Sequence, residues 1–103
     1  MTRVTVLKKG ESITGFECRG HAGYAEQGKD IVCAAISALT TTCVNALETV
    51  AGIRPAVTLH GADMTVALPD TQNRDAQVIL RAMLQGLSDI AAEYPAHLTI
   101  TRS

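Results

Sequence analysis

The chain has 103 residues and a mass of 10.9 kDa, which fits one domain, and nine Lys and Arg balance ten Asp and Glu to a net charge of -1. This balance excludes a polybasic nucleic-acid binder, because no excess positive charge is present to displace counterions. With two Tyr, one Phe and no Trp, the chain also lacks the aromatic residues of a single-strand stacking platform. We therefore expect an aliphatic core and no direct nucleic-acid partner.

The three cysteines, Cys18, Cys33 and Cys43, exclude two common uses of cysteine. An odd number without CxxC spacing is a poor disulfide framework and a poor zinc site, so we expect no metal and no cofactor. No charged segment followed by an apolar stretch opens the chain, so secretion is not expected. The thiols should then stay reduced in a cytoplasm.

Two strands separated by a turn at residues 9–11 are predicted for the first nineteen residues. The apolar residues that alternate along them are Val4, Val6, Phe16 and Cys18. A loop over residues 20–29 follows, with Gly20, Gly23 and Gly28 in nine positions. Because glycine leaves the backbone many conformations, this loop should be flexible, Tyr24 included.

Residues 31–51 show the periodicity of a helix, with Asp30 as its N-cap and Gly52 closing it. Glu48 is its only charged residue, yet Ser, Thr and Asn interrupt the apolar run, so no membrane span is expected. One side should pack on a sheet and the other should meet a partner subunit or a substrate. The face expected in the core is Val32, Ile36, Leu39, Cys43, Leu47 and Val50.

The second half of the chain predicts two strands around a turn at 60–63, a helix from about 73 to 94, and a last strand at 98–100. Gly86 weakens this helix locally and Pro95 stops it. The helix should bury Ala76, Leu80, Met83, Leu87, Ile90 and Tyr94. The order β-β-α-β-β-α-β predicts an α+β fold: a mostly antiparallel sheet of about five strands with two helices on one face.

Cys33 is the third residue of the first predicted helix, beside its free amide groups and the positive end of its dipole. Such a position favours the thiolate, which is the nucleophilic form of cysteine. The same amides could stabilise an oxyanion. The charge of Asp30 opposes the thiolate, unless its oxygens bind backbone amides.

His21 is the candidate base for this thiol, because a strand end and the next helix start can converge in space. Tyr24 and Gln27 could contact a substrate, and Ser37 lies one turn after Cys33 on the same side.

Simpler interpretations remain open for each of these residues. Free cysteines are usually buried, and we assign Cys18 and Cys43 to the core; position alone leaves Cys33 undecided. His60 and His97 should be solvated, and Asp30 caps a helix in any case. The segment Gly23–Lys29 satisfies GxxxxGK, but Asp30 replaces the Ser or Thr that binds magnesium, so nucleotide hydrolysis is disfavoured and anion binding slightly less so.

One segment carries a family resemblance. The run Gly20-His21-Ala22-Gly23-Tyr24-Ala25, then Gly28, then Asp30-Ile31-Val32-Cys33-Ala34-Ala35-Ile36-Ser37, closely resembles the signature of the ribosomal-processing cysteine proteases, the Prp family. The resemblance covers essentially the whole chain in length and element order, which would make residues 1–103 a single cysteine-protease domain.

The resemblance implies a dyad of His21 and Cys33, assisted by Asp30 and Ser37, and a glycine loop that moves aside for substrate. It also implies a cytoplasmic homodimer that removes the N-terminal extension from the precursor of large-subunit ribosomal protein twenty-seven, beside a pair of phenylalanines. No membrane partner is expected. The alternative is a non-enzymatic dimeric module that binds a peptide or assists ribosome assembly, with Cys33 merely buried.

Overall fold

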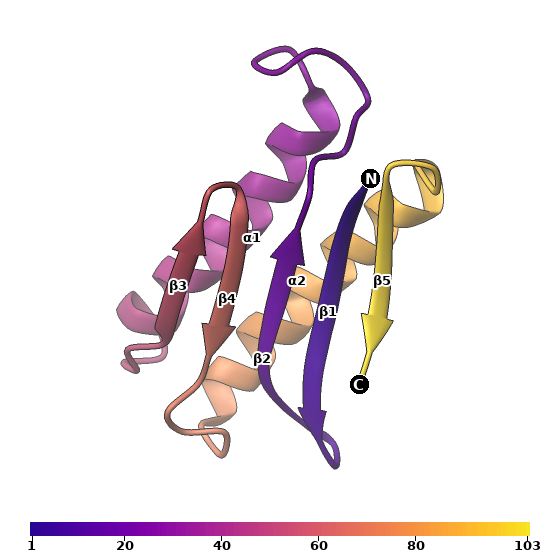
Figure 1. Ribbon diagram of the computed structural model, residues 1–103. Coiled ribbons are helices and arrows are strands. Elements are labelled where there is room, and N and C mark those ends of the chain that lie inside the picture. Colours follow the sequence, from indigo (N-terminus) through magenta and orange to yellow (C-terminus); the bar gives the residue numbers. More distant parts are fainter.

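The computed structural model describes residues 1–103, which form a five-stranded sheet with two helices on one of its faces (Figure 1). This arrangement confirms the predicted fold class and element order. In chain order the elements are β1 Thr2–Lys9, β2 Ser12–Arg19, α1 Ile31–Thr49, β3 Ala56–His60, β4 Asp63–Ala67, α2 Arg74–Glu93 and β5 Leu98–Arg102.

The strand order in the sheet is β3-β4-β2-β1-β5, and every neighbouring pair is antiparallel except β1 and β5. Thr2 pairs with Leu98 in the parallel pair, whereas Arg3 pairs with Arg19 at the end of β2. The start of β1, the start of β5 and the end of β2 therefore meet at one end of the sheet. The loop 20–29 leaves the sheet at this end, which decides what it can contact.

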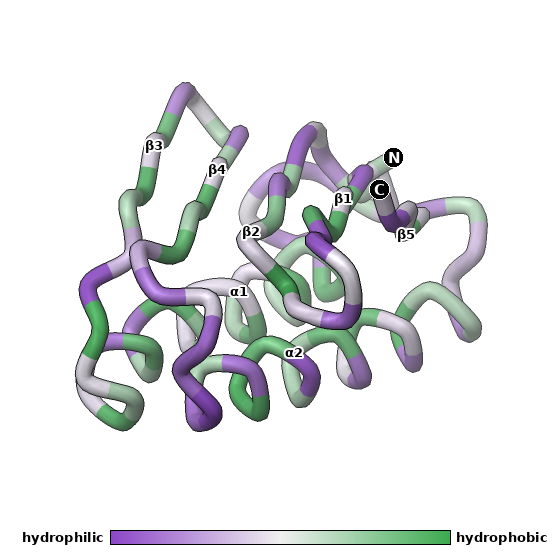
Figure 2. Tube along the Cα trace, turned by 90° about the horizontal axis from the view of Figure 1, so that it is seen from below, coloured by the Kyte–Doolittle hydropathy of each residue, from purple (hydrophilic) through white to green (hydrophobic).

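The core lies between the sheet and the helices, which form a single layer under the strands (Figure 2). Val4, Phe16, Leu47 and Leu87 contribute from β1, β2, α1 and α2, each with no measurable exposure. The helices approach closely where Gly86 faces Leu39: a Cβ atom at Gly86 would stand 2.9 Å from Leu39 Cδ1. This glycine, predicted only as a weak point of the helix, permits the contact between α1 and α2.

The buried face of α1 differs from the prediction at three positions, the mildest being Leu39, which is only partly buried against the core. Thr40 is buried, because its hydroxyl donates to the Ile36 carbonyl at 3.0 Å and so needs no water. Val50 is 67% exposed instead of buried, because the helix ends at Thr49 and Val50 is its C-cap. The predicted stop is correct: Gly52 adopts a φ of 73° and the Ile53 amide bonds back to the Leu47 carbonyl at 3.0 Å.

By length and composition alone α1 is apolar enough to cross a membrane. A core helix passes the same test, and one face of α1 is buried against the rest of the chain. Its other face is open.

Candidate active site

Asp30 organises the start of α1 with both carboxylate oxygens. Oδ1 accepts hydrogen bonds from the amides of Val32 at 3.0 Å and Cys33 at 2.9 Å, as the predicted N-cap requires. Oδ2 accepts from Tyr24 at 2.9 Å and Ala25 at 3.2 Å, which fastens the loop to the helix. The Cys33 amide is the main reason that the pKa of Asp30 lies below its ordinary value; burial opposes this, and the Ala25 and Tyr24 amides reinforce it.

These bonds correct one expectation about the helix start. The amides of Val32 and Cys33 are bound to the Asp30 carboxylate, and that of Ala34 donates to the Asp30 carbonyl at 3.0 Å. None of the three is free to bind an oxyanion in this conformation. A phosphate would need the same groups, so the arrangement gives no support to the GxxxxGK interpretation.

The entry to the loop is fixed by Gly20 and Asp63. Gly20 has a φ of 83°, and its amide donates to Asp63 Oδ1 at 2.9 Å. A Cβ atom at Gly20 would stand only 2.7 Å from the Met1 carbonyl oxygen, so glycine is required for two separate reasons. Sequence reasoning missed Asp63, since a turn residue 43 positions away carries no signal of this contact.

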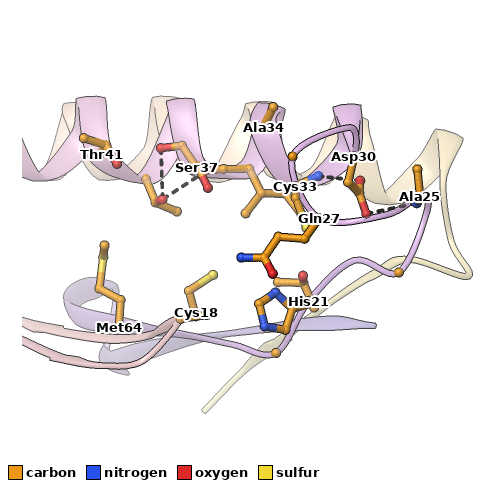
Figure 3. Close-up of a pocket in the computed structure, with 17 residues that line it drawn as sticks. Cys18, His21, Ala25, Gln27, Asp30, Cys33, Ala34, Ser37, Thr41 and Met64 are labelled. Carbon is orange, nitrogen blue, oxygen red and sulfur yellow. Dashed lines mark hydrogen bonds between the residues drawn. The ribbon is translucent and has the colours of Figure 1, made fainter.

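One cavity of about 580 Å³ brings the predicted site residues together (Figure 3). It lies between the start of α1, the loop, the end of β2 and the start of β4. Cys33 and Ser37 line it from the helix and His21 from the loop, and Asp30 lies at its end. The three loop glycines that were predicted, Gly20, Gly23 and Gly28, also line it, as does Gln27.

The sulfur of Cys33 accepts a hydrogen bond from the backbone amide of Ala22 at 3.2 Å. His21, the preceding residue, is exposed and shares the cavity, but no hydrogen bond joins its ring to the sulfur. The expected contact between imidazole and thiol is therefore not made in this conformation. Catalytic hydrogen bonds of ligand-free enzymes are often formed only when the substrate binds.

Cys18 packs against the core but is only partly buried, whereas the prediction buries it there. It is half-buried and lines the cavity beside Met64, its partner in the pairing of β2 with β4. Burial raises the pKa of the Cys18 thiol, and the negative charges of Asp63 and of a Cys33 thiolate raise it further. Cys43 is buried as predicted, and burial raises the pKa of its thiol to about 12.

Tyr24 and His97 also depart from the predictions. The Tyr24 ring lies edge-on to Tyr94 at 5.5 Å and to His97 at 5.4 Å, so it is fastened to the end of α2 and not to the cavity. His97 is half-buried and not fully solvated, and its Nδ1 lies 2.9 Å from the Ala22 carbonyl oxygen. His60 is exposed, as expected.

Comparison with known proteins identifies the family of this chain. Residues 1–99 match the family described as cysteine protease Prp. The chain is a member of the Prp family. The ribosomal processing cysteine protease Prp of Staphylococcus aureus is 35% identical over 99 residues, covering 94% of this chain and 92% of that protein. The Bacillus subtilis Prp is 30% identical over 108 residues, covering 98% and 96%.

Two crystal structures of the Staphylococcus aureus Prp share the fold over all of both chains. A complex with a covalently linked product peptide has a TM-score of 0.96 at 32% identity. A complex with a substrate peptide has a TM-score of 0.90 at 31% identity. Membership of the Prp family makes this chain a cysteine protease, and the alternative of a non-enzymatic module is not supported.

Proposed function

We propose that this chain is an endopeptidase in which Cys33 is the nucleophile and His21 the general base, and that it removes the N-terminal extension of the precursor of bacterial large-subunit ribosomal protein twenty-seven. The observation that carries the proposal is the open cavity that contains both residues, with Cys33 at the start of α1. Of the three cysteines, Cys33 has the position that activates a thiol. The relatives named as ribosomal processing proteases support the substrate class.

The reaction would proceed through an acyl-enzyme. His21 takes the proton of the Cys33 thiol, and the sulfur attacks the scissile carbonyl carbon. His21 then gives that proton to the leaving amine as the peptide bond breaks. Water hydrolyses the resulting thioester and restores the thiol. The dipole of α1 favours the negative charge that develops beside Cys33.

His21 must bring its ring to the sulfur before this sequence can begin. Its neighbours in the chain, Gly20 and Ala22, are held by hydrogen bonds, so the exposed His21 side chain would turn toward the sulfur by rotation about its own bonds. The part of the loop beyond Ala22 would move aside for the substrate, because Gly23 and Gly28 have positive φ values and Cβ atoms there would meet no close contact. Asp30 retains the helix start while the loop adjusts, since Oδ1 and Oδ2 bind different segments. Ser37 lies one turn along α1, where it can bind a substrate polar group.

The open face of α1 supports a homodimer as the working form. Ile31 is 59% exposed at its start, and Ala38, Thr42 and Ala46 border an apolar groove against α2 of about 330 Å³. Burying such uncharged surface in a second copy is favourable. We propose that residues 1–103 act as one cytoplasmic domain in this dimer, without a nucleic-acid or membrane partner.

The direct test is to incubate the protein with the extended ribosomal precursor and to measure the product masses. We expect one cut that releases the extension beside its phenylalanine pair, and no cut with Cys33→Ala. Binding of the precursor without cleavage would reject the proposal. A cut at another bond or in another peptide would retain the dyad and reject the substrate.

A further inference from the structure

His97 contacts the loop at Ala22, which is 75 residues away in the sequence. Its backbone is fixed on both sides: its amide donates to the Tyr94 carbonyl at 2.9 Å, and its carbonyl accepts from the Thr2 amide at 3.0 Å. The His97 ring therefore stands on a rigid base between the end of α2 and the start of β5. From this base Nδ1 reaches the Ala22 carbonyl at 2.9 Å.

Ala22 links this base to the candidate nucleophile. It is 1% exposed although it lies in a loop, and its two backbone groups bond to two different side chains. Its carbonyl accepts from His97, and its amide donates to Cys33 Sγ at 3.2 Å. A shift of Ala22 toward or away from His97 must change the second bond, because both groups belong to one residue.

We propose that His97 is a positioning residue for the cysteine protease reaction. It holds Ala22 so that the Ala22 amide donates to the Cys33 sulfur and supports the thiolate, and it keeps the adjoining His21 at the cavity. This inference rests on the proposed role of Cys33 as nucleophile. His97 does not line the cavity, so it acts through Ala22 and touches no reacting atom.

His97 needs only to donate one hydrogen bond to the Ala22 carbonyl oxygen. A carbonyl oxygen can only accept, so Nδ1 must carry hydrogen, in either the Nδ1–H tautomer or the imidazolium. An asparagine amide nitrogen stands at the same number of bonds from Cα as Nδ1 and can donate in the same way. Leucine branches at Cγ as asparagine does, but it donates nothing. Both variants remove the imidazole ring and its contact with Tyr24, and of the two only His97→Asn keeps a hydrogen-bond donor.

The main readout is the rate at which iodoacetamide labels Cys33 near neutral pH, located by peptide mass. Because a hydrogen bond contributes a net factor of roughly five, we expect about fivefold slower labelling in His97→Leu and near wild-type labelling in His97→Asn. The pH profile of labelling should move to higher pH in the leucine variant only. Hydrogen exchange at the Ala22 amide should accelerate in the same variant.

Cleavage of the precursor peptide gives an independent readout. His97→Leu should lower kcat with little change in KM, and His97→Asn should restore kcat. Equal labelling in wild type and both variants would overturn the proposal. Equally slow labelling in both variants would overturn it too, because the ring and not its donor would then matter. If His97→Leu does not fold, His97→Ala takes its place with the same expectations.

Failure of the proposed function would be recognised separately. A wild-type protein that leaves the precursor intact rejects that function, while labelling and hydrogen exchange still decide whether His97 controls the sulfur of Cys33.

Discussion

Cys18 and Cys33 face one cavity from opposite walls, Cys18 from the end of β2 and Cys33 from the start of α1 (Figure 3). A thiolate is less favoured on the sheet side of the cavity, at Cys18. Burial raises the pKa of Cys18, and the charge of Asp63 adds to this effect. Cys33 instead has the helix dipole and the Ala22 amide. Two thiols in one cavity should therefore differ in reactivity.

Labelling of the native protein with iodoacetamide at pH 8 should follow the order Cys33, then Cys18, then Cys43. Only the thiolate reacts, and a pKa of about 12 leaves Cys43 almost entirely protonated at this pH. Peptide masses over time give the three rates, and all three thiols should react in urea. Faster labelling of Cys18 than of Cys33 would contradict the assignment of the nucleophile.

Replacement of the two dyad residues should affect turnover very differently from replacement of another exposed histidine. Cys33→Ala removes the nucleophile and should reduce peptide cleavage to background. His21→Ala should lower kcat about 10²- to 10⁴-fold, the usual contribution of a general acid-base. His60→Ala is the control, since His60 lies on β3 and lines no cavity. Full activity of the His21→Ala variant would exclude His21 as the base.

Asp30 should make stability depend on acid pH in a defined direction. Its pKa is lowered in the folded protein, so its contribution is complete above the ordinary value of 3.8 and is lost as the pH falls through the folded value. The difference in Tm between wild type and Asp30→Asn should thus be largest near neutrality and shrink below about pH 4. Thermal unfolding followed by circular dichroism from pH 2 to 7 measures it.

Asp30→Ala provides the matched comparison. Asparagine keeps one oxygen for the Val32 and Cys33 amides, but turns an amide group toward Tyr24 and Ala25. Alanine loses both sets of bonds, so its Tm at pH 7 should be the lowest of the three. A Tm difference that grows in acid would refute this account of Asp30.

Gly20→Ala should cost more stability than Gly61→Ala, although both glycines have positive φ. Gly61 has open space around it, so alanine there should cost only the backbone strain, about 1 kcal/mol. At Gly20 the added carbon would also meet the Met1 carbonyl oxygen, which raises the expected cost to about 2–4 kcal/mol. Urea unfolding of the two variants measures the difference. An equal loss in the free energy of unfolding would mean that the Met1 carbonyl moves aside without cost.

The sequence predicted the elements well because their periodicity is local. Val4 on β1 and Phe16 on β2 each belong to an alternating apolar pattern, and Leu80 and Leu87 recur along one helix face. Both patterns can be recognised without knowing which elements pack together. The errors lie where a tertiary contact decides. Cys18 follows the strand alternation correctly, yet it lies two residues beyond Phe16, where it lines the cavity and is only partly buried.

The candidate site was predictable only where its contacts join residues that are close in the sequence. Asp30 and Cys33 are three residues apart, so the cap and the helix start follow from spacing. The contacts of Asp63 and His97 with the loop span 43 and 75 residues. They exist because β4 pairs with β2, and because β5 pairs in parallel with β1; no local pattern encodes either pairing.

The contact between Met1 and Gly20 has a practical consequence for handling the protein. Residues added before Met1, such as an affinity tag, would emerge beside the loop that contains His21 and could hinder its movement. Residues added after Ser103 would leave the sheet away from that loop, because β5 runs parallel to β1 (Figure 1). Activity should be measured with the fusion partner at the carboxyl end.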